Sequence, residues 1–259
     1  MKIYMHTDLE GVSGLDDEEQ MQFEKKDIYR QSCEKLMLDV NAAVAGAFDG
    51  GADHVAVADG HAGRSRLNFI MEMLDERAEY DERLNEKWWG LLDESYDGAY
   101  FVGAHAMAGT INGFLDHTQS SLTIYNWHIN GRRVGELAQW ATVAGAAGVP
   151  LLMVSGDEAA CAEARAFFDP IETAPVKQGV GRSRAIAYPA EEARARIREA
   201  ARNAIQLVGK AKPYKPIMPK EIKIEYTRSD HADAAARREG AERLDARTVR
   251  WVTSDPFRF

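Results

Sequence analysis

Residues 2–14, KIYMHTDLEGVSG, open with an apolar run that predicts a buried strand over Lys2–Thr7. Asp8 and Glu10 follow two positions apart, and the period of two of an extended backbone sends both carboxylates to the same side. Gly11 allows a sharp turn directly after them. Two crowded carboxylates repel each other unless a cation lies between them. Because an Asp at a strand end is also a common helix cap, this stretch alone leaves both a cap and a metal site open.

Three more short apolar runs resemble this first strand, and longer helical patterns separate them. The runs are His54–Ala58, Gly98–Gly103 and Pro150–Ser155. Before the first of them, the second half of Glu18–Phe48 has apolar residues three and four positions apart, which indicates a helix packed on a sheet. This alternation is typical of βαβ units. We therefore expect an α/β fold with a mostly parallel sheet flanked by helices.

The pattern changes after residue 120. Ser121–Asn130 alternates between apolar and polar residues and then meets Asn130-Gly131, the favoured two-residue hairpin turn. An antiparallel hairpin is therefore expected to interrupt the parallel pattern. Helices are expected over Val134–Gly148 and Glu191–Val208.

Three prolines make Lys210–Pro219 the best candidate for a linker. Beyond it we expect two strands flanking a polar helix, over Glu221–Arg228, His231–Arg243 and Thr248–Thr253. We accordingly divide the chain into a metal-binding catalytic α/β domain, residues 1–209, and a small C-terminal α+β segment, residues 210–259.

Composition excludes several classes of protein. The chain has 259 residues, of which 45% are hydrophobic, enough to bury a core. A net charge of −9 disfavours binding to nucleic acid, because a phosphate backbone attracts basic surfaces. No apolar run reaches membrane-spanning length and no signal-peptide pattern is present, so we expect a cytoplasmic protein with no membrane partner. The two cysteines, Cys33 and Cys161, lie in helical patterns and imply no disulfide framework.

Two histidines follow the ends of predicted strands. His61 comes after Asp59-Gly60, and His105 comes after Gly103-Ala104. A single histidine is more often a surface or core residue than a ligand. Here, however, three strands deliver carboxylates and two imidazoles to the edge of a parallel sheet where ligands bind. This set of side chains suits zinc better than magnesium, with manganese and cobalt as alternatives.

His117 and Glu136 are candidates to complete such a site. Taken alone, His117 could be a loop residue hydrogen-bonded to Asp116. Glu136 could be a first-turn helix residue that is favoured by the helix dipole.

These residues resemble the D-aminopeptidases of the dipeptide-permease type, a metallopeptidase family with a two-zinc centre. The matching blocks occur in the family's order from residue 1 to about residue 190. The blocks are Met5–Gly14, Val57–His61, Phe101–Ala106, His117, Ile129–Gly131, Val134–Leu137, Val154–Asp157, Val176–Gln178 and Arg182-Ser183. Residue by residue, the resemblance implies two zinc ions bound by Asp8, Glu10, His61, His105 and Glu136, with His117 as the catalytic side chain. It also implies a homo-oligomeric ring, such as a decamer.

The function that the resemblance implies is hydrolysis of small peptides with an N-terminal D-amino acid by a metal-activated water. Five side chains for two ions require at least one bridging carboxylate. We choose Asp8, because it projects between the two strands that carry His61 and His105. His117 would shuttle the proton to the leaving amine or stabilise the oxyanion.

Two loops depart from the family pattern, around His61 and between His105 and His117. Both are expected to line the substrate pocket, with Arg64, Arg66 and Phe114 as pocket residues. These departures favour an alternative, a two-metal amidohydrolase that acts on another small amide, amidine or lactam. A third hypothesis, a metal-binding or peptide-binding module without turnover, fits poorly with the retention of all six site residues.

Lys177 and Arg182 also match family positions. Their residue types allow either a structural salt bridge or binding of a substrate carboxylate.

Overall fold

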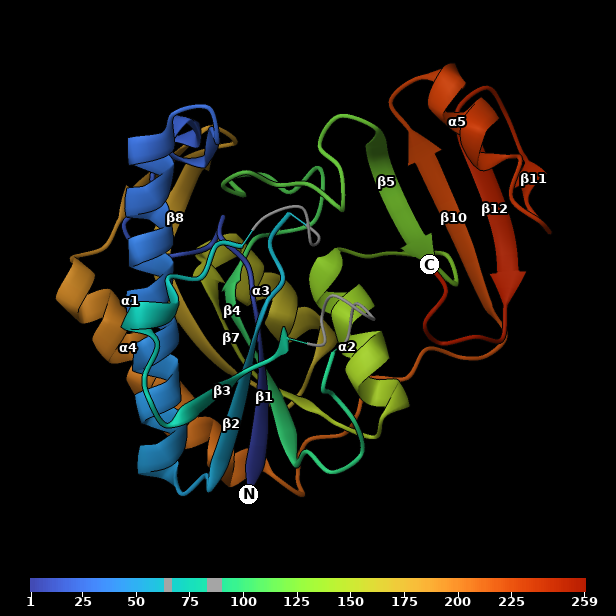
Figure 1. Ribbon diagram of the computed structural model, residues 1–259. Coiled ribbons are helices and arrows are strands. Elements are labelled where there is room, and N and C mark those ends of the chain that lie inside the picture. The colour runs from blue at the N-terminus through green and yellow to red at the C-terminus, as the bar shows by residue number, and fades with distance from the viewer. Residues whose placement is uncertain (63–66, 83–89) are drawn as a thin grey trace.

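The computed structural model describes residues 1–62, 67–82 and 90–259 (Figure 1). Within these residues, a seven-stranded sheet, sheet A, has the strand order β3-β2-β1-β4-β7-β8-β9. Its strands are β1 (Lys2–Thr7), β2 (His54–Asp59), β3 (Ala78–Tyr80), β4 (Gly98–Ala104), β7 (Leu151–Asp157), β8 (Glu172–Gly181) and β9 (Arg184–Ala187). All neighbours pair in parallel except β8 and β9, which form an antiparallel hairpin. The predicted α/β fold with a mostly parallel sheet is confirmed.

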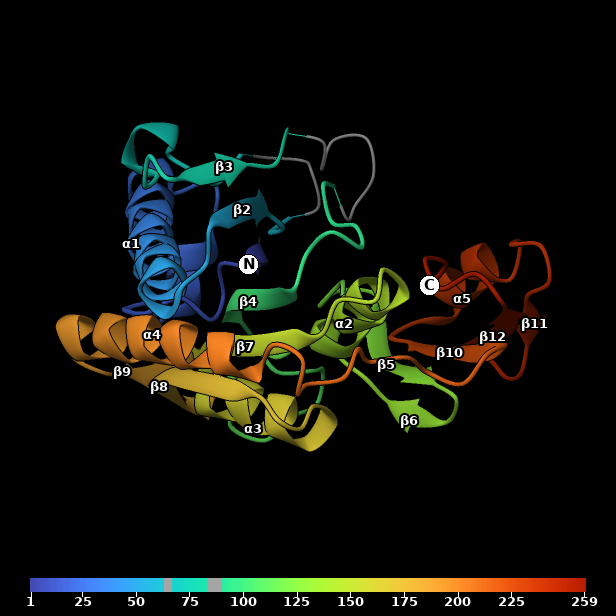
Figure 2. The ribbon, with the colours of Figure 1, turned by 90° about the horizontal axis from the view of Figure 1, so that it is seen from below.

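Helices cover both faces of sheet A (Figure 2). One face packs against α1 (Lys26–Gly50) and α4 (Ala190–Ala204), and the other against α2 (Glu136–Ala146) and α3 (Glu158–Phe167). Every residue of β4 and of β7 is buried as a result. This burial explains why these strands read as continuous apolar runs in the sequence. Short 3-10 helices lie at Glu18–Met21, Met71–Met73 and Ile205–Leu207.

A second sheet, sheet B, contains five strands within the described residues, in the order β11-β12-β10-β5-β6. Its strands are β5 (Ile124–Ile129), β6 (Arg132–Arg133), β10 (Lys220–Tyr226), β11 (Glu242–Arg243) and β12 (Thr248–Thr253), and the short helix α5 (Ser229–Ala235) accompanies them. All of its pairings are antiparallel. Sheet B therefore takes strands from both sides of residue 209, and the division into two domains at that residue stays a prediction.

The sequence located the main elements, extended one helix too far and missed one hairpin. The hairpin turn at Asn130-Gly131 is present, with both residues at positive φ of 51° and 79°. The predicted helix over His231–Arg243 is wrong in its second half, because α5 ends at Ala235 and Glu242–Arg243 is a strand. Gly240 at φ 74° reverses the chain between them. The β8–β9 hairpin was not predicted.

Among the described residues, no helix combines the length and the apolar character needed to cross a membrane.

Candidate metal centre

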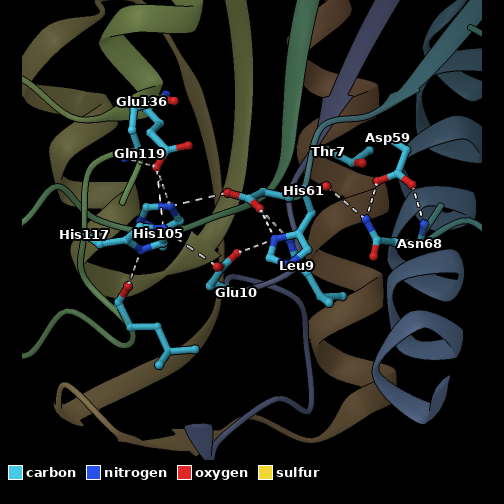
Figure 3. A network of polar contacts seen from close by, with 12 residues as sticks. Thr7, Leu9, Glu10, Asp59, His61, Asn68, His105, His117, Gln119 and Glu136 are labelled. Carbon is cyan, nitrogen blue, oxygen red and sulfur yellow. Dashed lines mark hydrogen bonds and ion pairs between the residues drawn. The ribbon is translucent and has the colours of Figure 1, made fainter. Parts of the chain in front are cut away.

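The centre forms where three neighbouring strands of sheet A end. The order β2-β1-β4 places the loops that carry His61, Asp8 with Glu10, and His105 next to one another (Figure 3). Gly11 is needed for this approach, because a Cβ there would lie 2.0 Å from the carbonyl oxygen of Ala104. The chain can therefore bring the two carboxylates of the β1 loop against the β4 loop.

Asp8 lies between the two histidines of this edge. Its Oδ1 is 2.9 Å from His61 Nδ1, and its Oδ2 is 3.4 Å from His105 Nε2. Glu10 Oε2 lies 3.1 Å from the same His61 nitrogen. One carboxylate thus contacts both imidazoles, which is the position expected of a bridging ligand.

Glu136 reaches the centre from the start of α2, directly after the β5–β6 hairpin of sheet B. It follows the β5–β6 hairpin and occupies the first turn of α2, where a carboxylate is favoured by the helix dipole. Its Oε1 lies 3.4 Å from His105 Nε2 and 3.6 Å from His117 Nε2, and it accepts a hydrogen bond of 2.7 Å from the backbone N–H of Gln119. Glu136 is therefore both a first-turn helix residue, as the sequence suggested, and a member of the cluster.

His117 completes the cluster from the long loop between β4 and β5. Its ring stacks on that of His105 with centroids 4.0 Å apart. His117 Nδ1 lies 2.8 Å from the carbonyl oxygen of Leu115, and a carbonyl only accepts, so Nδ1 carries the proton. Burial and the neighbouring His105 lower the pKa of His117, which keeps the ring neutral near pH 7. The lone pair of Nε2 therefore faces the cluster.

The hydrogen bonds of the centre are incomplete without a cation. His105 Nε2 and Glu10 Oε2 are buried, and in the described part of the chain neither makes a hydrogen bond of ordinary geometry, although Glu10 Oε2 lies 3.1 Å from His61 and His105 Nε2 lies 3.4 Å from two carboxylates. The ligand atoms of Asp8, Glu10 and His105 lie within 4.8 Å of one another, as do those of His105, His117 and Glu136. Buried polar atoms without partners are rare and need a reason. Carboxylate oxygens and imidazole nitrogens fit zinc or a similar divalent ion.

Burial and charge together perturb the pKa values here. Burial raises the pKa of Asp8 to about 7, and Glu10 adds to the rise. Burial also acts to raise the pKa of Glu10 and of Glu136, but the histidines outweigh it, holding Glu10 well below its usual value and Glu136 at about 2. A cation bound among these acids and imidazoles would displace the protons that they hold.

Lys177 anchors the loop that carries Asp8 and Glu10. Its fully buried Nζ donates hydrogen bonds to the carbonyl oxygens of Glu10, Val12 and Leu15, at 2.5, 2.9 and 2.8 Å. Burial lowers the pKa of Lys177 to about 7, whereas Asp157 raises it. Three accepting carbonyls require three N–H donors, so the ammonium form is the one that satisfies this arrangement.

A cavity of about 690 Å³ opens beside the cluster. One part of its wall contains cluster residues, among them Asp8, Glu10, His61, His117 and Glu136. The remainder is mostly aromatic and amide, and includes Trp127, Gln139, Trp140, Phe257 and Phe259. The cavity has the size of a small-molecule or short-peptide site.

Comparison with known proteins agrees with this geometry. The family model described as D-aminopeptidase matches residues 1–259. The chain belongs to this family. A D-aminopeptidase from Bacillus subtilis (strain 168) is 34% identical over 260 residues, covering 98% of this chain and 92% of the relative. The solved structure of the Zn-dependent D-aminopeptidase DppA from Bacillus subtilis, a self-compartmentalizing protease, has a TM-score of 0.92 at 32% identity, covering 99% of this chain and 93% of that one.

The six side chains predicted for the family's site lie together in one cluster. They are Asp8, Glu10, His61, His105, His117 and Glu136. Their individual roles as ligands or catalyst stay predictions. Asp59, which precedes His61, accepts hydrogen bonds from Asn68, whose side chain also donates to the carbonyl oxygen of His61 at 3.2 Å.

The expectations for other loop residues fared differently. Phe114 does not line the cavity, because it is 1% exposed and packs under Lys177 with Nζ 4.5 Å from its ring. Arg64 and Arg66 lie outside the described residues. Lys177 pairs with no carboxylate among the described residues, and its three donors are used by backbone carbonyls. Arg182 is 3.9 Å from Asp116, and its backbone carbonyl accepts a hydrogen bond from the N–H of Leu115.

Several functional contacts were missed by sequence reasoning. Gln119 positions Glu136 through its backbone N–H, and its side chain donates to Gln139 Oε1 at 2.9 Å. Leu115, at φ 52°, presents the carbonyl that orients His117. No local pattern marks a backbone group as a partner, so only the position of Gln119 two residues after His117 could have drawn attention to it.

Proposed function

We propose that this protein is a zinc-dependent aminopeptidase that uses two metal ions to remove N-terminal D-residues from small peptides. The observation that carries the proposal is the buried cluster itself: Asp8 lies between His61 and His105, and the ligand atoms of Asp8, Glu10 and His105 lie within 4.8 Å of one another. Membership of the D-aminopeptidase family supports the reaction class, and the zinc dependence of the DppA structure supports the metal.

Asp8, Glu10, His61, His105 and Glu136 are the proposed ligands of the two ions. Asp8 is the proposed bridge, because each of its oxygens already lies beside a different histidine. For His105, the ligating nitrogen is Nε2, since Nδ1 lies 3.0 Å from the carbonyl oxygen of Ala106 and is the protonated one. When bound, the two ions lower the pKa of a coordinated water and polarise the scissile carbonyl.

His117 is the proposed proton carrier. The carbonyl of Leu115 fixes its tautomer, so Nε2 is free to take a proton from the attacking water and to deliver it to the leaving amine. His117 Nε2 is 3.6 Å from Glu136 and 3.9 Å from Glu10, so the imidazolium formed on the way is stabilised by two carboxylates.

Metal analysis paired with a stereochemical assay tests this function. We expect about two zinc ions per chain, and cleavage of D-Ala-D-Ala but not of L-Ala-L-Ala by the metal-loaded protein. Two metals with neither peptide cleaved would favour the alternative of another amide, amidine or lactam substrate. A protein that binds no stoichiometric metal even when zinc is added would contradict the proposal.

A homo-oligomer is the proposed assembly, with a closed ring such as a decamer as its expected form. The self-compartmentalizing description of the DppA protease supports it. Ile111 and Leu122, on the loop that carries His117, are 89% and 80% exposed, and such apolar side chains favour contact between copies. Light scattering with size-exclusion chromatography tests it, and a monomer at working concentrations would contradict it.

A further inference from the structure

A buried acid on α3 has no part in the proposed reaction. Glu163 is 7% exposed and lies in the middle of this helix, which follows β7 of sheet A. It is not a proposed ligand, and it is not among the described residues that line the cavity. Burial raises its pKa to about 7, as expected for a carboxyl group removed from water. Burying such a group costs free energy, so its position needs a reason.

One oxygen of Glu163 is bonded to the loop that carries His105. Glu163 Oε2 accepts a 2.8 Å hydrogen bond from the backbone N–H of Met107, two residues after His105. On the other side of His105, the chain belongs to β4, which ends at Ala104. The imidazole is therefore carried by a short segment that the sheet holds at Ala104 and α3 holds at Met107.

The other oxygen of Glu163 packs against the residue that precedes Glu136. A Cβ placed on Gly135 would lie 2.8 Å from Glu163 Oε1 and 2.8 Å from the Cβ of Met107, so no side chain fits at this position. Oε1 is buried and has no hydrogen-bond partner among the residues that the structure describes. One carboxyl group is thus placed against both segments, the one that carries His105 and the one that begins α2.

These two segments meet on one side of the metal centre. His105 Nε2 and Glu136 Oε1 lie 3.4 Å apart, close enough to bind the same ion (Figure 3). The other proposed ligands follow β1 and β2, and within the described part of the chain Glu163 forms no hydrogen bond with those loops. Its hydrogen bond therefore bears on one pair of ligands and not on the whole cluster.

We propose that Glu163 is a positioning residue that sets the separation of the metal ligands His105 and Glu136. The inference rests on the proposed two-metal function. Without the carboxyl group, the N–H of Met107 would lose its acceptor and the packing beside Gly135 would loosen, so the two segments could move relative to each other. Residues that orient metal ligands contribute about 10-fold to 100-fold to metal affinity. Glu163 should therefore act on the ion that these two ligands hold, and much less on the other ion.

Titration with zinc against a chromophoric chelator tests the inference without any peptide. In Glu163→Leu, which removes the acceptor, we expect one of the two ions to bind about 10-fold to 100-fold more weakly. Glu163→Gln keeps an oxygen for the N–H of Met107 and should restore the wild-type affinity. Cys161→Ala is the matched control, because it removes a buried side chain from the same helix without removing a hydrogen bond to the His105 loop. Thermal melting of each variant reports its stability.

A second variant reaches the same contact from the other side. In Gly135→Ala, the added methyl group would displace Glu163 Oε1 or the side chain of Met107, and it should weaken the same ion. This variant decides the inference if Glu163→Leu does not fold. Unchanged affinity for both ions in Gly135→Ala would then overturn it.

Rescue by glutamine separates positioning from a general loss of stability. If Glu163→Leu melts earlier, as Cys161→Ala does, but binds both ions with wild-type affinity, the inference is overturned. Equal weakening in the Leu and Gln variants also overturns it, because the hydrogen-bond acceptor would then not be the cause. If the wild type binds two ions but cleaves no D-peptide, only the aminopeptidase proposal fails, since the zinc titration uses no peptide. A wild type that binds no zinc overturns both.

Discussion

The carboxyl edge of sheet A and the exposed face of sheet B use the same kinds of charged residue with opposite results. On sheet B, Arg250 pairs with Glu221 and Glu242 at 3.3 and 2.7 Å, all in contact with solvent. Such pairs contribute little to stability because water screens them. At the edge of sheet A, Asp8 and Glu10 are buried and crowded against the imidazoles of His61 and His105. A functional centre is therefore marked by charged and titratable groups that are buried together, and not by the number of charges.

Two buried lysines extend this comparison. Lys177 and Lys220 are both fully buried, yet Lys177 bonds three carbonyls of the ligand loop, whereas Lys220 donates a 2.7 Å bond to Pro256 and lies over the ring of Phe259. One lysine therefore holds the loop of the proposed metal ligands, and the other holds the chain after β12. Their removal should have different functional consequences even where the cost in stability is similar.

The largest expected effect comes from Asp8→Ala. Loss of the proposed bridge should remove bound metal and reduce peptide hydrolysis to the level of the metal-free protein, more than the roughly 100-fold loss that follows when only the partner of a ligand is removed. Elemental analysis and the D-Ala-D-Ala assay measure both. The control is Glu24→Ala, at an exposed position far from the cluster in the sequence. Full metal content in Asp8→Ala would contradict the assignment.

His117→Ala should separate catalysis from metal binding. We expect kcat to fall about 100-fold to 10,000-fold with metal content unchanged, because a proton carrier is lost and no proposed ligand is. The matched control is His231→Ala, whose imidazole contacts Thr227 and Arg228 away from the cavity. Loss of one ion in His117→Ala would instead show that His117 is a metal ligand. Its ligand atom lies close enough to those of His105 and Glu136 for that role.

The two lysines are compared as Lys177→Met and Lys220→Met. Lys177→Met leaves three buried carbonyls without a donor and Lys220→Met leaves one half-buried carbonyl, so each should lower the free energy of unfolding, by about 3 and about 1 kcal/mol. Only Lys177→Met should also weaken zinc binding, by about 10-fold to 100-fold, because its loop carries Asp8 and Glu10. Competition with a chromophoric chelator and thermal denaturation give the two readouts. Equal zinc affinity in both variants would show that the loop keeps its shape without Lys177.

The effect confined to stability, with none on the metal or on catalysis, concerns a buried acid outside the cluster. Asp39 accepts hydrogen bonds from the N–H and hydroxyl of Ser13, and burial raises its pKa from 3.8 to about 6. Between these values the unfolded chain has lost the proton and the folded chain retains it, so stability falls as pH rises from about 4 to 6. The fall amounts to about 3 kcal/mol at most.

Urea unfolding of wild type and Asp39→Asn between pH 4 and 7 isolates this contribution, because the Asn variant should lack the fall. Asp49→Asn on the same helix is the control. The pKa of Asp49 is lowered by Arg198, so its contribution has the opposite sign. Parallel pH curves for wild type and Asp39→Asn would contradict the prediction.

The strands that are buried on both faces could be predicted, because their sequences are continuous apolar runs. The strands β1, β2, β4 and β7 were located to within two residues, because both faces of each are covered. The candidate ligands Asp8, Glu10, His61 and His105 followed from where these strands end. Family resemblance, and not local pattern, brought Glu136 and His117 into the same site.

Contacts that join distant segments were not predictable. Strand β8 contains Pro175 and a lysine, and its Lys177 is buried only because carbonyls more than 160 residues earlier in the chain accept its donors. Arg238 was expected in the middle of a helix, but α5 ends before it, and Arg238 lines the cavity with its guanidinium 5.2 Å from the ring of Trp251 in β12. Neither position carries a periodic signal, since each depends on tertiary packing alone.

Glu136 follows a hairpin of sheet B, whereas the other four proposed ligands follow strands of sheet A. Metal ions bound by Glu136 together with the other four ligands would stabilise the contact between the two sheets by their binding free energy. Chelation should then speed the hydrogen exchange of backbone amides in β5 and β10, although β10 contains no ligand and lies almost 90 residues beyond Glu136. Metal supply would thereby govern how often the two sheets separate, and so how readily proteases attack the seam between them.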